Sequence, residues 1–409
     1  MQTTQESPAI AGGQKSKTTP YGKEQRYGEE ELRELKEALD QGTLFYASGQ
    51  KVKQLEREFA EKCGVPYAIT CTSGTSAVHA ALMAGGISPG EEVITAPITD
   101  MGTVSPILYQ GAIPIFADVD PHSYVITPES VEACITERTK AVVAVNLAGN
   151  ACELFALKEI CDAKGILLIE DCAQSFGVQF GGQSIGSIGQ MGCFSFNEYK
   201  HISCGDGGIV ITRDKELAER LRLATDKAYN RQPDALEKRP TFLANNYRMT
   251  ELQGAVALAQ LRKLESIVAR RRDWCTKLTA GLQNIVGLHL PKILPECEPS
   301  WWFYMMRVEA ERLGADTDTF AKALQAEGLP VGAHYIGKCL YEYPLFQNHT
   351  VFARGTHACD AYPYHAGMCP VAEQVLDTCI MLSINEAYTE RDLEETIRGF
   401  RKVAAWFAK

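Results

Sequence analysis

An apolar segment, Gly165–Asp171, ends in two carboxylates, Glu170 and Asp171. The segment has the length and composition of a buried strand, and open α/β sheets bind ligands at the carboxyl ends of their strands. Taken alone, Asp171 is better explained as a cap of the following helix, because that is an ordinary role for Asp after a strand. A role in chemistry therefore depends on the residues that accompany it.

Lys200 follows the next apolar strand, Cys193–Phe196, and precedes a glycine-rich turn, Gly205–Gly208. A lysine in this position is typical of a nucleophilic amine that lies where backbone and ligand must approach closely. The competing interpretation is an exposed loop lysine, which is the commoner situation for any one lysine.

A third motif is the small-residue turn Thr72–Ser76, which leads directly into the apolar helical segment Ala77–Leu82. Backbone N–H groups and hydroxyls at the start of a helix can bind a phosphate. Ser and Thr at helix starts usually only cap the helix, so this motif alone does not establish an anion site.

Together these motifs resemble the DegT/DnrJ/EryC/StrS family of sugar aminotransferases, which have fold type I and use pyridoxal 5'-phosphate (PLP). The resemblance covers roughly residues 30–405 and rests on an ordered set of motifs rather than on any single one. That set is Ser73–Thr75, Asp118–Asp120, Glu170–Gln174, Phe194–Phe196, Lys200, Gly205–Gly208, Asn246–Met249 and Cys369–Glu373.

The resemblance implies that Lys200 carries PLP as a Schiff base (the internal aldimine) and later moves protons. Asp171 is expected to face the pyridine nitrogen and keep it protonated, and Gln174 is expected near the phenolic oxygen. A homodimer with shared active sites is also implied, because one phosphate ligand comes from the neighbouring subunit. The phosphate ligands implied are Ser73, Gly74, Thr75 and Ser195, with Asn246 reaching the neighbouring subunit's cofactor.

The family also contains sugar dehydratases in which histidine replaces the Schiff-base lysine. Lys200, not His201, aligns with that position, and histidine cannot form the covalent link that transamination requires. We therefore expect a two-step, ping-pong transfer from glutamate or glutamine to a nucleotide-linked keto-sugar or a keto-cyclitol. Two alternatives stay open: a PLP- or PMP-dependent dehydratase, and a non-catalytic PLP-binding regulator, although such regulators usually carry a DNA-binding domain that this sequence does not suggest.

Two segments depart from the family pattern. The family usually carries a ring-stacking aromatic residue within the segment Ile98–Thr103, whereas Asp100 occupies that place here and Met101 could cover the ring instead. The segment Thr225–Lys227 also differs from the family's arginine–histidine–glycine pattern. Both departures fall on the substrate side of the site.

Other candidate residues have competing explanations. Tyr335 and His334 match a substrate-side segment of the family, although packing explains Tyr335 about equally well. Arg270–Arg272 could neutralise a diphosphate, but three charges on a long helix usually form a solvated face. Trp301–Tyr304 is expected to be a buried strand, because aromatic runs usually belong to a core.

The elements that must position these residues follow an α/β pattern. From about Ser48 to Leu264, short aliphatic segments alternate with amphipathic ones, which is typical of βαβ units on a parallel sheet. We expect a long helix from Thr250 to about Trp274 and a last helix at Glu390–Phe407. The expected strands are Glu92–Ala96, Ile113–Val119, Ala141–Asn146, Gly165–Asp171, Gly192–Phe196 and Gly208–Thr212, with helices at Ser76–Gly85, Leu154–Ala163 and Leu217–Ala224.

The expected fold is therefore α/β: a three-layer α-β-α PLP-dependent transferase fold of the aspartate-aminotransferase-like type, with a mostly parallel central sheet. A smaller C-terminal α+β domain should accompany it. The expected division is a flexible N-terminal tail at 1–20, a large PLP-binding domain at 21–265 and a small domain at 266–409.

Composition excludes several other classes of protein. The 14 cysteines include no Cys-x-x-Cys pair and the eight histidines no zinc-binding spacing, so we expect reduced thiols and no metal. The net charge of −10 argues against nucleic-acid binding. No segment is long and apolar enough for a membrane anchor or signal peptide, so we expect a cytoplasmic protein with small-molecule partners.

Overall fold

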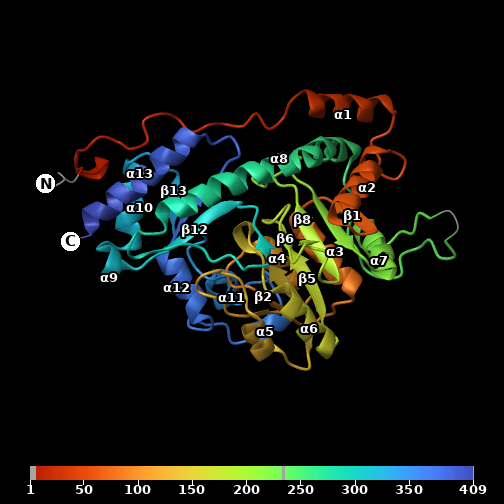
Figure 1. Cartoon of the computed structure of the whole chain (residues 1–409). Coiled ribbons are helices and arrows are strands. Elements are labelled where there is room, and N and C mark those ends of the chain that lie inside the picture. The colour runs from red at the N-terminus through yellow and green to blue at the C-terminus, as the bar shows by residue number, and fades with distance from the viewer. Residues whose placement is uncertain (1–5, 233–234, 409) are drawn as a thin grey trace.

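A seven-stranded sheet lies at the centre of the computed structural model, which describes residues 6–232 and 235–408 (Figure 1). The strand order is β1-β9-β8-β5-β4-β2-β3. Only β9 runs antiparallel to its neighbours, β1 and β8, and the other pairings are parallel. The strands are β1 Tyr67–Cys71, β2 Glu92–Thr95, β3 Ile113–Phe116, β4 Thr139–Val145, β5 Leu167–Asp171, β8 Met191–Ser195 and β9 Gly208–Thr212.

Helices cover both faces of this sheet, because successive side chains of a strand point to opposite faces. In β5, Leu168 belongs to one apolar core and Ile169 to the other. Leu168 shares its core with side chains of α2 and α8, and Ile169 shares its core with side chains of α3 and α7. The predicted three-layer α-β-α architecture is therefore confirmed. These helices are α2 Lys51–Cys63, α3 Gly74–Gly85, α7 Lys215–Thr225 and α8 Glu251–Leu282.

A second sheet of four antiparallel strands lies toward the C-terminus, in the order β10-β12-β14-β13. Its core includes the fully buried Tyr304 and Phe320. Because α8 runs without interruption through residue 265, the expected domain boundary there stays a prediction. The elements of this part are β10 Leu288–His289, β12 Phe303–Val308, α9 Ala310–Leu313, α10 Thr317–Ala326, β13 Val331–Ala333, β14 Cys379–Ser383 and α13 Glu390–Phe407.

The remaining elements connect and cover these two sheets. Three short strands form a further small sheet, in the order β11-β6-β7, which packs on the same apolar core as the central sheet. The other elements are η1 Ala9–Ala11, α1 Glu29–Asp40, α4 Met101–Tyr109, α5 Pro128–Cys134, η2 Leu147–Gly149, α6 Leu154–Lys164, β6 Gln179–Phe180, β7 Gln183–Ser184, β11 Cys297–Glu298, η3 Leu340–Glu342, α11 Pro344–Gln347, η4 Ala358–Ala361 and α12 Pro370–Thr378.

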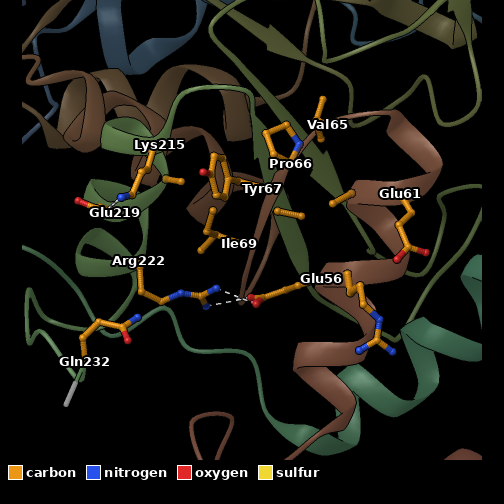
Figure 2. Close-up of a pocket in the computed structure, with 14 residues that line it drawn as sticks. Glu56, Glu61, Val65, Pro66, Tyr67, Ile69, Lys215, Glu219, Arg222 and Gln232 are labelled. Carbon is orange, nitrogen blue, oxygen red and sulfur yellow. Dashed lines mark hydrogen bonds and ion pairs between the residues drawn. The ribbon is translucent and has the colours of Figure 1, made fainter. Parts of the chain in front are cut away.

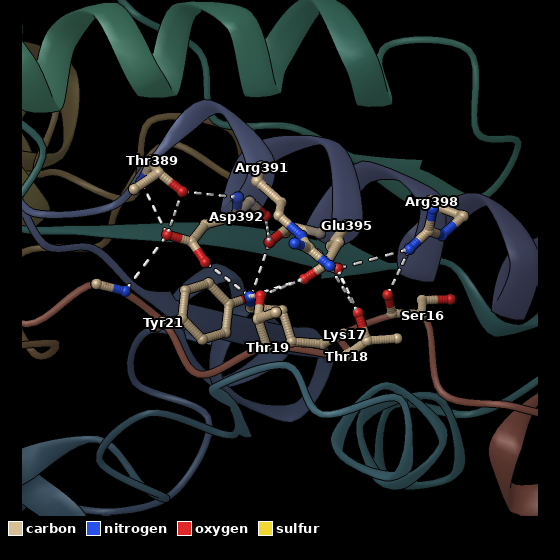
Figure 3. Close-up of polar contacts among 12 residues, drawn as sticks. Ser16, Lys17, Thr18, Thr19, Tyr21, Thr389, Arg391, Asp392, Glu395 and Arg398 are labelled. Atoms are coloured by element: carbon tan, nitrogen blue, oxygen red, sulfur yellow. Dashed lines mark hydrogen bonds and ion pairs between the residues drawn. The ribbon is translucent and has the colours of Figure 1, made fainter.

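The N-terminal segment is not the loose tail that its composition predicts. Residues 1–5 lie outside the described residues, but Lys17 is buried, and its Nζ lies 2.6 Å from Asp392 Oδ1 and 2.8 Å from Glu395 Oε2 in α13 (Figure 3). The carboxylate of Glu327 accepts backbone N–H groups of Ala9 and Ser16, each at 2.6 Å. The prediction is therefore wrong for these residues, and no local pattern could correct it because each partner is more than 300 positions away.

The structure also bears on the thiols and on membrane-spanning segments. All 14 cysteines are described, and each is a free thiol. Among residues 6–232 and 235–408, no helix combines the length and the apolar character that crossing a bilayer requires.

Candidate active site

A cavity of about 250 Å³ opens where the central strands end. Its lining includes the last residues of β4, β5 and β8, which are Val145, Asp171 and Ser195. This is the edge of an open α/β sheet at which ligands bind. The cavity brings together eight of the predicted residues: Ser73, Gly74, Thr75, Asp171, Gln174, Ser195, Lys200 and Tyr335.

A larger cavity, of about 600 Å³, lies between α2, β1 and α7 (Figure 2). The guanidinium of Arg222 makes two hydrogen bonds to the carboxylate of Glu56 there, at 2.9 and 2.7 Å. None of the predicted site residues lines this cavity. Size therefore does not identify the candidate site, and the chemistry of the lining does.

The amino terminus of α3 forms one wall of the smaller cavity. Ser73 is the N-cap, and its Oγ accepts the backbone N–H of Ser76 at 3.0 Å. The first N–H groups of a helix have no partner within the helix, so those of Gly74 and Thr75 remain available to an anion. A Cβ at Gly74 would lie 2.6 Å from the Cβ of Ser195, so only glycine allows α3 to approach β8 this closely. These features form a polar cradle suited to an anion such as a phosphate.

Asp171 lies at the end of β5 and is 6% exposed. Its Oδ2 accepts the hydroxyl of Thr103 at 2.7 Å, and its Oδ1 accepts the backbone N–H of Ala173 at 3.1 Å. Burial raises the pKa of Asp171 above its usual range, and these hydrogen bonds and the charge of Lys200 oppose the rise. A carboxylate in such a place is stabilised by any cation that enters the cavity.

The neighbouring Glu170 does not line the cavity, and its carboxylate binds the backbone of residues 186–189 instead. It is fully buried and accepts N–H groups from Gly186, Ile188 and Gly189, at 2.7, 2.9 and 2.6 Å. Burial raises the pKa of Glu170 to about 7. Of the two carboxylates at the end of this strand, only Asp171 lines the cavity.

Lys200 is half-buried, with its Nζ 3.8 Å from the centre of the Trp302 ring. Burial lowers the pKa of Lys200 to about 8, against the opposing charges of Asp171 and Asp100. His201 is fully buried and does not line the cavity, and its Nε2 lies 3.1 Å from the Ser300 carbonyl oxygen. Lys200 and His201 therefore have different surroundings, and only the lysine amine is available for chemistry in the cavity.

Gln174 and Tyr335 form another part of the wall. Gln174 Oε1 accepts the backbone N–H of Ala148 at 2.9 Å, and its Nε2 donates to the Tyr335 hydroxyl at 3.4 Å. His334 does not line the cavity: its Nδ1 lies 3.0 Å from the Leu376 carbonyl oxygen, so it is not brought to the predicted substrate side. Its backbone and that of Tyr335 both have positive φ, 65° and 42°, in a turn that separates the two side chains.

Asn246 lies in an exposed loop outside this cavity. Its predicted reach to a second subunit's cofactor stays a prediction. The same loop contributes Arg248, whose Nη1 donates to Asp226 Oδ1 at 2.6 Å.

Several lining residues were not predicted to belong to the site. Trp302 was expected within a buried strand, but β12 begins one residue later, and the indole lies in the cavity instead. Thr103 was given no role, although it contacts Asp171. Asp100 lines the cavity where the family has an aromatic residue, and its Oδ1 caps α4 by accepting the N–H of Gly102 at 2.7 Å. Met101, the suggested substitute, does not line the cavity.

Comparison with known proteins gives consistent matches over nearly the whole chain. Residues 25–401 match the model of the DegT/DnrJ/EryC1/StrS aminotransferase family. The chain is 30% identical, over 384 residues, to the spore coat polysaccharide biosynthesis protein SpsC of Bacillus subtilis (strain 168), a match that covers 92% of this chain and 95% of SpsC.

Solved structures agree with this match. The aminotransferase from Psychrobacter cryohalolentis superposes with a TM-score of 0.86 at 27% identity, covering 95% of this chain and 100% of that one. DesV of S. venezuelae, solved in complex with a ketimine intermediate, superposes with a TM-score of 0.80 at 29% identity, covering 93% and 95% of the two chains.

Proposed function

This chain belongs to the DegT/DnrJ/EryC1/StrS aminotransferase family and is a PLP-dependent aminotransferase, and we propose that it moves an amino group from glutamate or glutamine to a keto group of a sugar or cyclitol. The observation that carries the proposal is that one cavity holds Lys200, Asp171 and the amino terminus of α3. A sugar acceptor is supported by SpsC, whose name places it in polysaccharide biosynthesis.

The described residues fit PLP. The cradle at Gly74, which a Cβ would fill, suits the phosphate, with hydroxyls from Ser73, Thr75 and Ser195 beside it. The carboxylate of Asp171 is the partner for a protonated pyridine nitrogen. When bound, PLP supplies an electron sink for the bond that breaks at the substrate carbon. Gln174, which lines the same cavity, would contact the phenolic oxygen.

Each of these side chains has one task in the proposed reaction. With PLP bound, the negative charge of the buried Asp171 would hold a proton on the pyridine nitrogen. Lys200 Nζ takes a proton from the substrate carbon and returns a proton later, and a pKa near 8 leaves both of its protonation states accessible near neutral pH.

We also propose a homodimer in which Asn246 of one subunit completes the other subunit's phosphate site. Asn246 is exposed and lies outside the cavity of its own chain, which supports a contact with a second copy. Such a contact would give each site residues from both subunits. The cytoplasmic location stays a prediction.

The decisive experiment is an acceptor panel with the purified, PLP-loaded enzyme. Glutamate and glutamine are each offered as donor, with nucleotide-linked ketohexoses and free inososes as acceptors, and Lys200→Ala as the control. We expect an aminated product together with the oxo-acid of the donor, and a spectral change of the bound cofactor with donor alone. Loss of water from the sugar without amine transfer would favour the dehydratase alternative. A protein that binds PLP but turns over no pair would favour the regulator.

A further inference from the structure

The indole of Trp302 contacts the amine of Lys200. The ring centre lies 3.8 Å from Nζ, within the distance at which an ammonium is attracted to an aromatic face. Trp302 and Lys200 line the same cavity although they are far apart in the chain.

Two hydrogen bonds fix Trp302, one of them to the segment that carries Lys200 and the other to η2. The indole Nε1–H donates to the Tyr199 carbonyl at 2.6 Å, and Tyr199 immediately precedes the lysine. The backbone N–H of Trp302 donates to the Ala148 carbonyl at 3.0 Å. The ring and the amine are therefore anchored to each other through one short stretch of backbone.

A buried ion pair between Arg271 and Glu386 supports the backbone of Trp301 and Trp302. Arg271 is 3% exposed, its Nη1 donates to the carbonyls of Trp301 and Trp302 at 3.4 Å each, and its Nε donates to Glu386 Oε2 at 2.8 Å. The arginine run Arg270–Arg272 is thus not a uniformly solvated face. Its central member supports the segment that presents the indole.

The backbone before Trp302 is strained. Trp301 has φ of 53°, in the left-handed region that a residue with a side chain seldom adopts. Among the described residues, Trp301 Nε1, Ser300 Oγ and His201 Nδ1 are buried without a hydrogen-bond partner. Strain and unpaired polar groups of this kind persist only where the surrounding structure enforces them, and they concentrate at functional sites.

We propose that Trp302 is a positioning residue whose indole holds the amine of Lys200 in one place and shields it from water. The proposal rests on the proposed function of Lys200 and adds a residue that acts through it. Without the ring, the four-carbon side chain of Lys200 could adopt more conformations, and its amine would be more exposed to water. The charged and titratable groups around the amine are Asp100, Asp171 and Asp206, with Tyr335 in the same wall and His201 behind it.

Two effects of the ring on the amine oppose each other. Its face favours the charged ammonium, and its bulk favours the neutral amine by excluding water. Burial by all the surroundings, of which the ring is a part, outweighs the charges of Asp171 and Asp100 and lowers the pKa of Lys200 to about 8. Removal of the ring should therefore raise the pKa of Lys200.

The test measures this pKa without relying on turnover. The full-length protein, stripped of cofactor, is labelled with acetic anhydride across a pH series, and mass spectrometry follows the peptide that contains Lys200. Wild type should give a midpoint near 8. Trp302→Leu should raise it by about one unit, which slows labelling at pH 7 about tenfold. Trp302→Phe keeps a ring but loses the bond to Tyr199, and should give a smaller rise.

Trp406→Phe, at a partly exposed site on α13, is the matched control and should leave the midpoint unchanged. In the PLP-loaded enzyme, kcat should fall in Trp302→Leu while KM for the donor changes little, since Lys200 acts after the donor binds. Circular dichroism verifies folding, and if Trp302→Leu does not fold, Trp302→Phe decides. An unchanged midpoint in the folded variant overturns the positioning role, even if the enzyme is an aminotransferase. An altered midpoint in a protein that transfers no amine would refute only the proposed function.

Discussion

The hydroxyl of Thr103 donates a 2.7 Å hydrogen bond to Oδ2 of Asp171, joining the first turn of α4 to the end of β5. The same hydroxyl lies 2.8 Å from Thr99 Oγ1. The carboxylate is thus oriented by a side chain of α4, which fixes the direction in which it can face a cation.

The first prediction concerns Asp171→Asn. The amide can still accept the Thr103 hydroxyl, so we expect a normal fold and some bound cofactor. It carries no charge to hold a proton on the pyridine nitrogen, so kcat should fall at least about 100-fold. Steady-state kinetics and cofactor absorbance measure the two effects. Thr103→Val is the milder comparison, because it leaves the charge and removes only the orienting bond. Near-normal turnover in Asp171→Asn would remove the residue from its proposed role.

The phosphate cradle gives the second prediction. In Gly74→Ala, the new Cβ would lie 2.6 Å from Ser195 Cβ, which forces α3 and β8 apart. We expect PLP affinity to fall by about tenfold or more, measured by fluorescence titration of the apoprotein. Gly332→Ala is the control, since a Cβ there has nothing within 4 Å. Equal affinities in the two variants would show that the phosphate lies elsewhere.

The third prediction concerns the N-terminal segment (Figure 3). Lys17→Met leaves Asp392 and Glu395 without their buried partner, and removing one member of such a pair costs about 3–5 kcal/mol. The population of the detached form of the segment should therefore rise by at least about 100-fold. Chymotrypsin cleavage near Tyr21 measures this, and the protease does not depend on the lysine. Lys15→Met, at an exposed position, should cleave like wild type. If the segment were already loose in the wild-type protein, chymotrypsin would cleave both variants rapidly and at the same rate.

Shared sites give the fourth prediction. Lys200→Ala and Asn246→Ala are each expected to be inactive or nearly so as homodimers. Mixed and refolded together, they should form heterodimers in which one site has both native residues, and about a quarter of wild-type activity should return if mixing is random. A sample of each variant refolded alone is the control. Failure of the mixture to recover, under conditions that restore wild type, would contradict a site completed by Asn246.

Much of the central sheet could be predicted because its strands are buried on both faces and therefore appear as continuous apolar segments. β9 was predicted with the residues that it has, Gly208–Thr212, whereas β3 ends at Phe116 rather than Val119. β1, Tyr67–Cys71, was not predicted. The helix expected to end near Trp274 continues to Leu282 in α8.

In the site, the residues that belong to sequence motifs were predicted and those defined only by spatial proximity were not. Lys200, Asp171 and Ser73 each follow a recognisable strand or begin a helix. Trp302 lies 102 positions from Lys200, and nothing local to either residue indicates that they meet. The buried pairing of Lys17 was missed for the same reason, since composition describes a segment but not its distant partners.

The central claim, that Lys200 is the residue that binds the cofactor covalently, is tested most directly by borohydride reduction of the PLP-loaded enzyme followed by peptide mass spectrometry. The account predicts that the peptide containing Lys200 gains the mass of the reduced cofactor and that no other lysine does. Lys200→Ala should still bind PLP through the α3 cradle and Asp171, but should retain no label and transfer no amine. Label on a different lysine, or sustained amine transfer by Lys200→Ala, would contradict the account.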